Sequence, residues 1–190
     1  MKHLNLSLLI IALSFNLVAQ DQNLIPFGST WKYLDNGSNQ GTSWRNSSFN
    51  DTSWSSGPAQ LGYGDGDENT VVSYGFSGTN KHRTTYFRHT FNIADVSLFK
   101  NFLIKLIKDD GALVYVNGQN VMRSNFGTNT YQYDDFAYSS ISGSEEGIIW
   151  EEFVAPSHFQ NGTNVIAVEV HQYNASSSDL SFDLELIGFD

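Results

Sequence analysis

The feature that most limits the fold of this chain is a pair of segments in which a turn dipeptide leads into an alternating strand. Residues 109–118 read Asp-Asp-Gly-Ala-Leu-Val-Tyr-Val-Asn-Gly, and residues 161–171 begin with Asn-Gly and end in Val-Ile-Ala-Val-Glu-Val-His. Asp-Gly and Asn-Gly favour tight turns because these residues adopt positive φ at low cost. The β-branched residues between the turns favour strands. The first segment therefore predicts a hairpin with an Asn-Gly turn, and the second a long core strand.

Other parts of the chain show the same period of two. Further strands are predicted at residues 30–34, 102–108, 147–154 and 180–187. The clearest alternation is in 84–93, where Phe87 and Phe91 fall on one face. Only 94–100 and 157–159 predict helical turns. About eight strands separated by turns rich in Gly, Asn and Ser predict an all-β fold, a two-sheet antiparallel β-sandwich with jelly-roll topology.

The N-terminus predicts a signal peptide over residues 1–19. Lys2 gives a basic start, and the apolar run over 6–19 is too short to span a membrane. Cleavage would leave 20–190, which has the length of one domain. We therefore expect a secreted protein, extracellular or periplasmic, with no membrane insertion after cleavage. A retained membrane anchor is the alternative.

The charge balance limits the partners. The chain has 20 Asp and Glu against 10 Lys and Arg, a net charge of −10. Such a chain repels phosphate backbones, so we expect no nucleic acid as a partner. There is no cysteine, which removes thiolate metal sites and cysteine nucleophiles. The acidity suits a soluble secreted protein or one that holds cations.

Several motifs spread over most of residues 20–190 carry a resemblance to a known family. They are Trp31-Lys32-Tyr33, the Phe49 to Trp54 element, the Tyr86 to Phe91 strand, the Asp109 to Gly118 hairpin and the Gly162 to Val168 strand. As a set they resemble the galactose-binding-like jelly rolls, which include the sugar-binding domains of β-galactosidase-type glycosidases and related carbohydrate-binding modules. The run from Leu61 to Asp67 also looks like that of modules within large secreted bacterial proteins. The resemblance implies a polysaccharide or glycan as partner, since this family binds more often than it catalyses.

The best metal candidate is the segment 64–69, Gly-Asp-Gly-Asp-Glu-Asn. Its oxygen-bearing side chains are Asp65, Asp67, Glu68 and Asn69. Alternating oxygen ligands are typical of the start of a calcium loop. Thr70 and Phe76 stand where an EF-hand has Gly and Glu, which excludes a true EF-hand. Related carbohydrate-binding jelly rolls often hold a structural calcium between loops, so the resemblance implies Ca²⁺ here; an exposed acidic turn without metal is the alternative.

The first group of candidate ligand-binding residues lies in the long segment from 62 to 83. Long loops on a rigid scaffold often carry function. The segment offers rings and hydrogen-bonding groups at Tyr63, Tyr74, Phe76, His82 and Arg83. Sugars present apolar faces to rings and hydroxyls to polar groups, so a patch needs both kinds of side chain.

The second group lies at the end of the strand predicted over residues 164–172. If its aliphatic residues face the core, Glu169 and His171 face the other way, with Tyr173 just beyond the strand. We expect these side chains to meet the ligand with the 62–83 loop. Asp110, at another strand end, is a further candidate for a sugar diol or calcium. An ordinary polar outer face with a hydrogen-bonded histidine is the alternative.

Motifs for catalysis are absent from the sequence. There is no Gly-x-Ser-x-Gly, no His-Glu-x-x-His and no phosphate loop. The acid pairs 145–146 and 151–152 are adjacent in sequence, and adjacent strand residues point to opposite faces. Neither pair by itself can therefore supply the two facing carboxylates of a glycosidase site. The sequence thus predicts a secreted, non-catalytic carbohydrate-binding module with a structural calcium. The alternatives are a structural or adhesion accessory module related to domains appended to secreted hydrolases or phosphoesterases, and a small polysaccharide lyase or hydrolase.

Overall fold

The computed structural model describes residues 20–127, 130–145 and 147–190. The predicted signal peptide, residues 1–19, lies outside the described residues. No helix in the described part of the chain is long and apolar enough to cross a membrane.

The described residues form strands joined by turns, with four 3-10 turns and no α-helix among them. The strands are β1 (Gln22–Ile25), β2 (Thr30–Leu34), β3 (Ser55–Pro58), β4 (Leu61–Tyr63), β5 (Thr70–Val71), β6 (Thr84–Ile93), β7 (Asn101–Asp109), β8 (Gly111–Val116), β9 (Gln119–Ser124), β10 (Trp150–Val154), β11 (Gly162–His171) and β12 (Leu180–Phe189). The 3-10 turns are η1 (Ser43–Arg45), η2 (Val96–Leu98), η3 (Gly143–Glu145) and η4 (Pro156–His158). The strand predicted over 147–154 is shorter than expected, and the turns predicted at 94–100 and 157–159 are η2 and η4.

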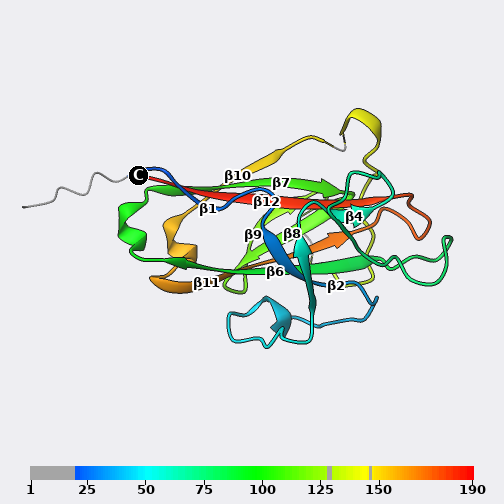
Figure 1. Cartoon of the computed structure of the whole chain (residues 1–190), viewed down its shortest axis with the longest axis horizontal. Coiled ribbons are helices and arrows are strands. Elements are labelled where there is room, and N and C mark those ends of the chain that lie inside the picture. The colour runs from blue at the N-terminus through cyan, green and yellow to red at the C-terminus, as the bar shows by residue number, and fades with distance from the viewer. Residues whose placement is uncertain (1–19, 128–129, 146) are drawn as a thin grey trace, which may run out of the picture.

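Two six-stranded sheets face each other (Figure 1). The first has the order β10-β7-β12-β4-β5, with β1 also paired to β12, and the second has the order β3-β2-β6-β11-β8-β9. All pairings are antiparallel except that of β4 with β5. Most connections cross from one sheet to the other, among them those from β6 to β7, from β7 to β8 and from β11 to β12, which confirms the predicted jelly-roll sandwich.

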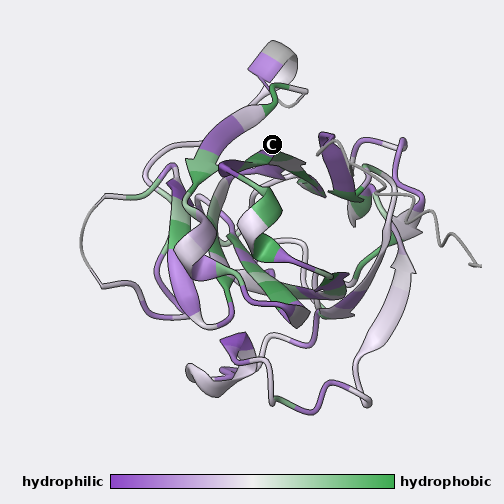
Figure 2. Cartoon of the chain, turned by 90° about the vertical axis from the view of Figure 1, so that its left-hand side faces the viewer, coloured by the Kyte–Doolittle hydropathy of each residue, from purple (hydrophilic) through white to green (hydrophobic). Residues whose placement is uncertain are grey.

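Apolar side chains of both sheets form the core between the layers. Figure 2 shows that the strands enclosing it carry many hydrophobic residues. Phe87 and Phe91 of β6 face inward, as the alternation predicts, and so does Val168 of β11. Phe87 stacks on Phe182 of β12 with ring centroids 4.1 Å apart, which joins the two sheets. Aromatic rings bury large areas, so such pairs dominate the packing of a β-sandwich.

The predicted Asn-Gly hairpin is present between β8 and β9. Asn117 and Gly118 form its two-residue loop with φ values of 50° and 88°. Positive φ at both positions matches the right-handed twist of the flanking strands. Alanine at Gly118 would also place its Cβ 2.7 Å from the Asn46 side-chain oxygen.

The outer face of the second sheet is covered by a separate apolar cluster. Its buried members are Trp44, Trp54, Tyr86, Leu113, Tyr115 and Ala167. Trp44 and Trp54 come from the excursion between β2 and β3, and their rings stack with centroids 6.4 Å apart. This layer decides which polar side chains of β6, β8 and β11 reach the surface.

Candidate functional site

Two loops far apart in sequence lie side by side at one end of the sandwich, opposite the C-terminus (Figure 1). The Gln172 N–H donates to the Arg83 carbonyl at 2.8 Å, and the Lys81 N–H donates to the Ala175 carbonyl at 2.8 Å. The segment before β6 is thus held against the segment after β11. The long loop therefore meets the end of β11.

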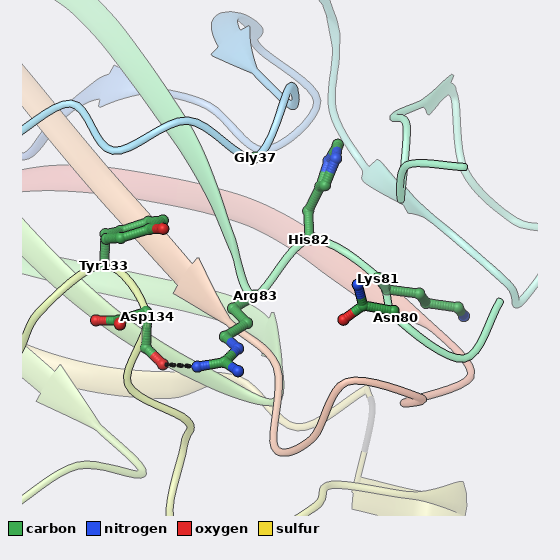
Figure 3. Close-up of a pocket in the computed structure, with 7 residues that line it drawn as sticks. All are labelled: Gly37, Asn80, Lys81, His82, Arg83, Tyr133 and Asp134. Carbon is green, nitrogen blue, oxygen red and sulfur yellow. Dashed lines mark hydrogen bonds between the residues drawn. The ribbon is translucent and has the colours of Figure 1, made fainter. Parts of the chain in front are cut away.

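A cavity of about 300 Å³ opens beside this junction (Figure 3). It is lined by Gly37, Asn80, Lys81, His82, Arg83, Tyr133 and Asp134. Arg83 donates from Nη1 to the Asp134 carbonyl at 2.7 Å, and its guanidinium lies 4.4 Å from the centre of the Phe136 ring. The cavity therefore combines two cationic side chains, a carboxylate, an amide and two rings.

His82 separates this cavity from a second one. The second cavity, of about 230 Å³, is lined by Asp35, Asn36, Ser73, Gly75, Phe76 and His82. A Cβ at Gly37 would lie 2.5 Å from the His82 ring, and one at Gly75 would lie 2.8 Å from it. Nδ1 of His82 also lies 2.8 Å from the Asp35 carbonyl oxygen. Two glycines with positive φ thus leave room for one imidazole between two hollows.

Exposed rings border this region. Phe76 is fully exposed, and Tyr74 and Tyr173 are 41% and 40% exposed. Nζ of Lys81 lies 4.9 Å from the centre of the Tyr74 ring, within reach of a cation–π contact. Burial lowers the pKa of Lys81, and the nearby Asp179 carboxylate opposes that shift. The structure brings the predicted residues Tyr74, Phe76, His82, Arg83 and Tyr173 to the same end of the molecule.

Four other predicted ligand residues are buried. Tyr63 is 5% exposed, Glu169 is 2% exposed, and Asp110 and His171 are fully buried. The Tyr63 hydroxyl accepts a hydrogen bond from Nε2 of Gln172 at 3.0 Å, and burial raises its pKa. The structure does not bring these four side chains into an exposed patch.

Asp110 holds the surrounding loops in place. Its Oδ1 accepts a hydrogen bond from the Ile141 N–H at 2.7 Å. Its Oδ2 accepts from the Tyr173 N–H at 2.7 Å and from the Ser177 hydroxyl at 3.2 Å. A carboxylate with three donors is satisfied by the protein itself, so a structural role accounts for Asp110.

Glu169 and His171 lie on the outer face of the second sheet, but other segments cover that face. Glu169 accepts hydrogen bonds from the Tyr115 hydroxyl at 2.7 Å and from Nη2 of Arg45 at 3.0 Å. Burial alone would raise the pKa of Glu169, but the neighbouring His171, Arg45 and Tyr115 together lower it. Nδ1 of His171 lies 2.8 Å from the Asp135 carbonyl oxygen. The hydrogen-bonded histidine that the sequence left as an alternative is what the structure contains.

The sequence interpretation missed four lining residues, Asn80, Lys81, Tyr133 and Asp134. One signal could have indicated Lys81. Lys81, His82 and Arg83 form a basic run in a strongly acidic chain. Tyr133 and Asp134 follow β9 by several residues, and only tertiary packing brings them beside that run.

In the acidic loop, residues 64–69, the structure brings the predicted metal ligands together with one exception. Oxygen atoms of Asp65, Asp67 and Glu68 lie within 4.8 Å of one another. Glu68 accepts hydrogen bonds from the backbone N–H groups of Asp65 and Gly66, each at 3.0 Å. Asn69 is not part of this group and donates from Nδ2 to the Ala59 carbonyl at 2.8 Å. Carboxylate oxygens are the ligands that hard divalent cations prefer, so the donor set fits such a metal.

Comparisons with known proteins support the fold. No protein-family profile matches the sequence, and the search of curated proteins found no match. Among solved structures, the chain is similar to a β-glucuronidase of Bacteroides uniformis, with a TM-score of 0.57 and 16% identity over 89% of this chain and 18% of that one. A β-glucuronidase of an uncultured Clostridium gives a TM-score of 0.52 and 11% identity over 95% and 30%.

A calcium-binding mutant of β-glucuronidase 2 of Bacteroides uniformis is also similar, with a TM-score of 0.54 and 16% identity over 89% and 18%. This chain thus spans less than a third of the length of each of these proteins. At such identities the likeness shows a shared fold alone.

Proposed function

We propose that this protein is a non-catalytic carbohydrate-binding module whose ligand lies in the cavity beside His82 and Arg83. The observation that carries the proposal is the convergence of that polar cavity with the exposed rings of Tyr74, Phe76 and Tyr173. Sugar hydroxyls would meet the amide, guanidinium and carboxylate groups, and apolar sugar faces would stack on the rings. The similarity to domain-sized parts of glycosidases adds support.

Binding of soluble polysaccharides tests the proposal, with neutral and uronic-acid-containing polymers compared by calorimetry. Removing a central ring from an interface typically costs about 2 kcal/mol, roughly thirtyfold in affinity. Tyr74→Ala and Tyr173→Ala should therefore weaken binding with the fold intact. Phe153→Ala is the matched control, because Phe153 is 65% exposed on β10 at the opposite end of the sandwich. No binding at millimolar polysaccharide, or equal losses in all three variants, would contradict the proposal.

We further propose that the acidic loop holds a structural Ca²⁺ through Asp65 and Asp67. A bound calcium would join the loop to β12, because Oδ2 of Asp65 already accepts a hydrogen bond from the Ser181 hydroxyl at 3.1 Å. Ligand binding to the native state alone raises stability by mass action. Millimolar calcium should therefore raise the melting temperature, and chelator should reverse the rise. Identical melting curves with calcium and with chelator would refute the metal.

An accessory role in a larger assembly is the second candidate, because several exposed apolar side chains lie at one edge of the first sheet. Ile148 and Ile149, just before β10, are 44% and 45% exposed, and Trp150 and Phe153 on β10 are 38% and 65% exposed. Contiguous apolar surface often marks a contact with another domain. Ile149→Glu with Phe153→Glu should leave the isolated module folded but disrupt such a contact. Faster proteolytic release of the module from the larger assembly would reveal the lost contact.

A further inference from the structure

The carboxylate of Asp109 is buried without a partner. The residue is fully buried, and neither of its side-chain oxygens has a hydrogen-bond partner among the described residues. An ionised carboxylate in such a place costs several kcal/mol unless donors or a cation compensate for the lost water. The neighbouring Asp110 accepts hydrogen bonds from backbone N–H groups, so its buried carboxylate is compensated by the protein and that of Asp109 is not.

The sheet places Asp109 next to the acidic loop. Asp109 of β7 is directly paired with Ser181 of β12, so their side chains lie on the same face of the sheet. Ile107 lies on this face two residues earlier. Ile107 and Ser181 line a cavity of about 200 Å³ together with Asp65 and Asp67. Asp109 is therefore the neighbour, on the same face of the sheet, of two residues that line the cavity whose wall is the acidic loop.

A second carboxylate reaches Asp109 from the segment before β12. A Cβ at Gly64 would lie 2.8 Å from both Cα and Cβ of Asp179, so the acidic loop packs directly on that residue. The carboxylates of Asp110 and Asp179 both lie close enough to Asp109 to interact with it electrostatically. Like charges thus gather where two loops and two strands meet.

The two nearby lysines, Lys81 and Lys108, donate hydrogen bonds to groups other than the Asp109 carboxylate. Nζ of Lys108 donates to the backbone carbonyl of Asp110 at 2.7 Å. Nζ of Lys81 donates to the carbonyls of Ser177 and Ser178 at 2.6 and 2.8 Å. Neither ammonium group therefore fills the place of a donor to Asp109. One further oxygen is in the same situation, since Oε1 of Gln172 is buried without a partner.

We propose that Asp109 and Asp179 are inner ligands of a calcium ion that Asp65 and Asp67 close off from solvent. The proposal rests on the calcium proposed above for the acidic loop and moves the ion from the surface of the loop to its buried side. Calcium takes six to eight oxygens from carboxylates, amides and carbonyls, and the side-chain oxygen of Gln172 is an additional donor of this kind. The ion would supply the positive charge that the buried carboxylates lack.

Calcium titrations of the whole chain and three variants test the proposal. The wild type should bind Ca²⁺ by calorimetry and melt about 5–10 °C higher at a hundredfold excess over its dissociation constant. Asp109→Asn should lose at least tenfold in calcium affinity while its metal-free melting temperature stays equal or rises, because asparagine is neutral and needs no compensating cation. Asp183→Asn is the matched control: Asp183 is also a buried acid of this sheet, but it accepts hydrogen bonds from the Gly28 and Leu184 N–H groups. It should lower stability with and without calcium and leave the affinity unchanged.

Calcium affinity equal to the wild type in Asp109→Asn would overturn the proposal that Asp109 is an inner ligand. If the double variant Asp65→Asn with Asp67→Asn then loses calcium binding, the acidic loop alone is the site. Calcium binding that survives the loop variant and is lost in Asp109→Asn would instead support the inner ligand and refute the loop. A wild type that binds no calcium would overturn both. Should Asp109→Asn fail to fold, Asp179→Asn is measured in its place, with the same two outcomes.

Discussion

Nε2 of His171 lies 3.6 Å from Oε2 of Glu169, and the two side chains leave β11 on the face turned away from the core. Neither is exposed to solvent. This face is covered by Trp44, Tyr115 and the segment around Asp135. Glu169 and His171, which could bind a ligand if they were exposed, are therefore buried beside the second apolar cluster. Their measurable effects should therefore concern stability.

Glu169→Gln should lower the free energy of unfolding by about 2–3 kcal/mol, because hydrogen bonds to a buried charge from Arg45 and Tyr115 are weakened. Urea denaturation measures this change. Glu185→Gln is the control: its partners near the surface are Lys105, 3.5 Å away, and Asn23, which donates a hydrogen bond at 2.7 Å, and such exposed pairs contribute about 0–1 kcal/mol. Equal effects of the two substitutions would contradict the buried network.

The difference in stability between the wild type and Glu169→Gln should depend on pH. The pKa of Glu169 is lowered in the folded protein, so its carboxylate binds protons more weakly there than in the unfolded chain. The stability that it contributes is complete above the unfolded pKa of about 4.3 and is lost as pH falls through the folded value. Denaturation of both proteins between pH 7 and pH 3 should show the gap closing at the acid end. A constant gap would mean that the charge of Glu169 is not what stabilises the fold.

Gly37→Ala should disturb the candidate sugar site, because its new Cβ would lie 2.5 Å from the His82 ring. Gly41→Ala is a matched control, since Gly41 also has a positive φ, of 60°, but no atom within 4 Å of an added Cβ. Both substitutions should cost about 1–2 kcal/mol in backbone strain. Only Gly37→Ala should shift the NMR signals of His82 and weaken polysaccharide binding. Unchanged His82 signals in Gly37→Ala would show that the two residues are not in contact.

Trp54→Ala should lower stability by about 3–5 kcal/mol, because the ring is 5% exposed and packs against Trp44, Phe49 and Tyr86. Thermal unfolding measures the loss. Polysaccharide affinity, measured well below the melting temperature, should stay within about twofold of the wild type. Lost affinity at full folding would mean that the excursion between β2 and β3 takes part in binding.

The sequence alone determined the strands and turns, since these depend on local properties. The period of two in residues 84–93 predicted β6 with its bounds, and Asn117-Gly118 predicted the hairpin between β8 and β9. The acidic loop was found for the same reason, because Asp65, Asp67 and Glu68 are neighbours along the chain. Alternation also placed Glu169 on the correct face of β11.

Only the tertiary structure decided whether that face meets water. Whether Glu169 and His171 are exposed depends on segments more than thirty residues away that cover the second sheet, and alternation along one strand carries no information about them. The cavity beside His82 likewise needs Gly37 and Tyr133, which no local pattern joins to it. Asp109 and Asp110 are alike in sequence, yet one has three donors and the other has none, because hydrogen bonds to a side chain depend on which distant backbone groups pack against it.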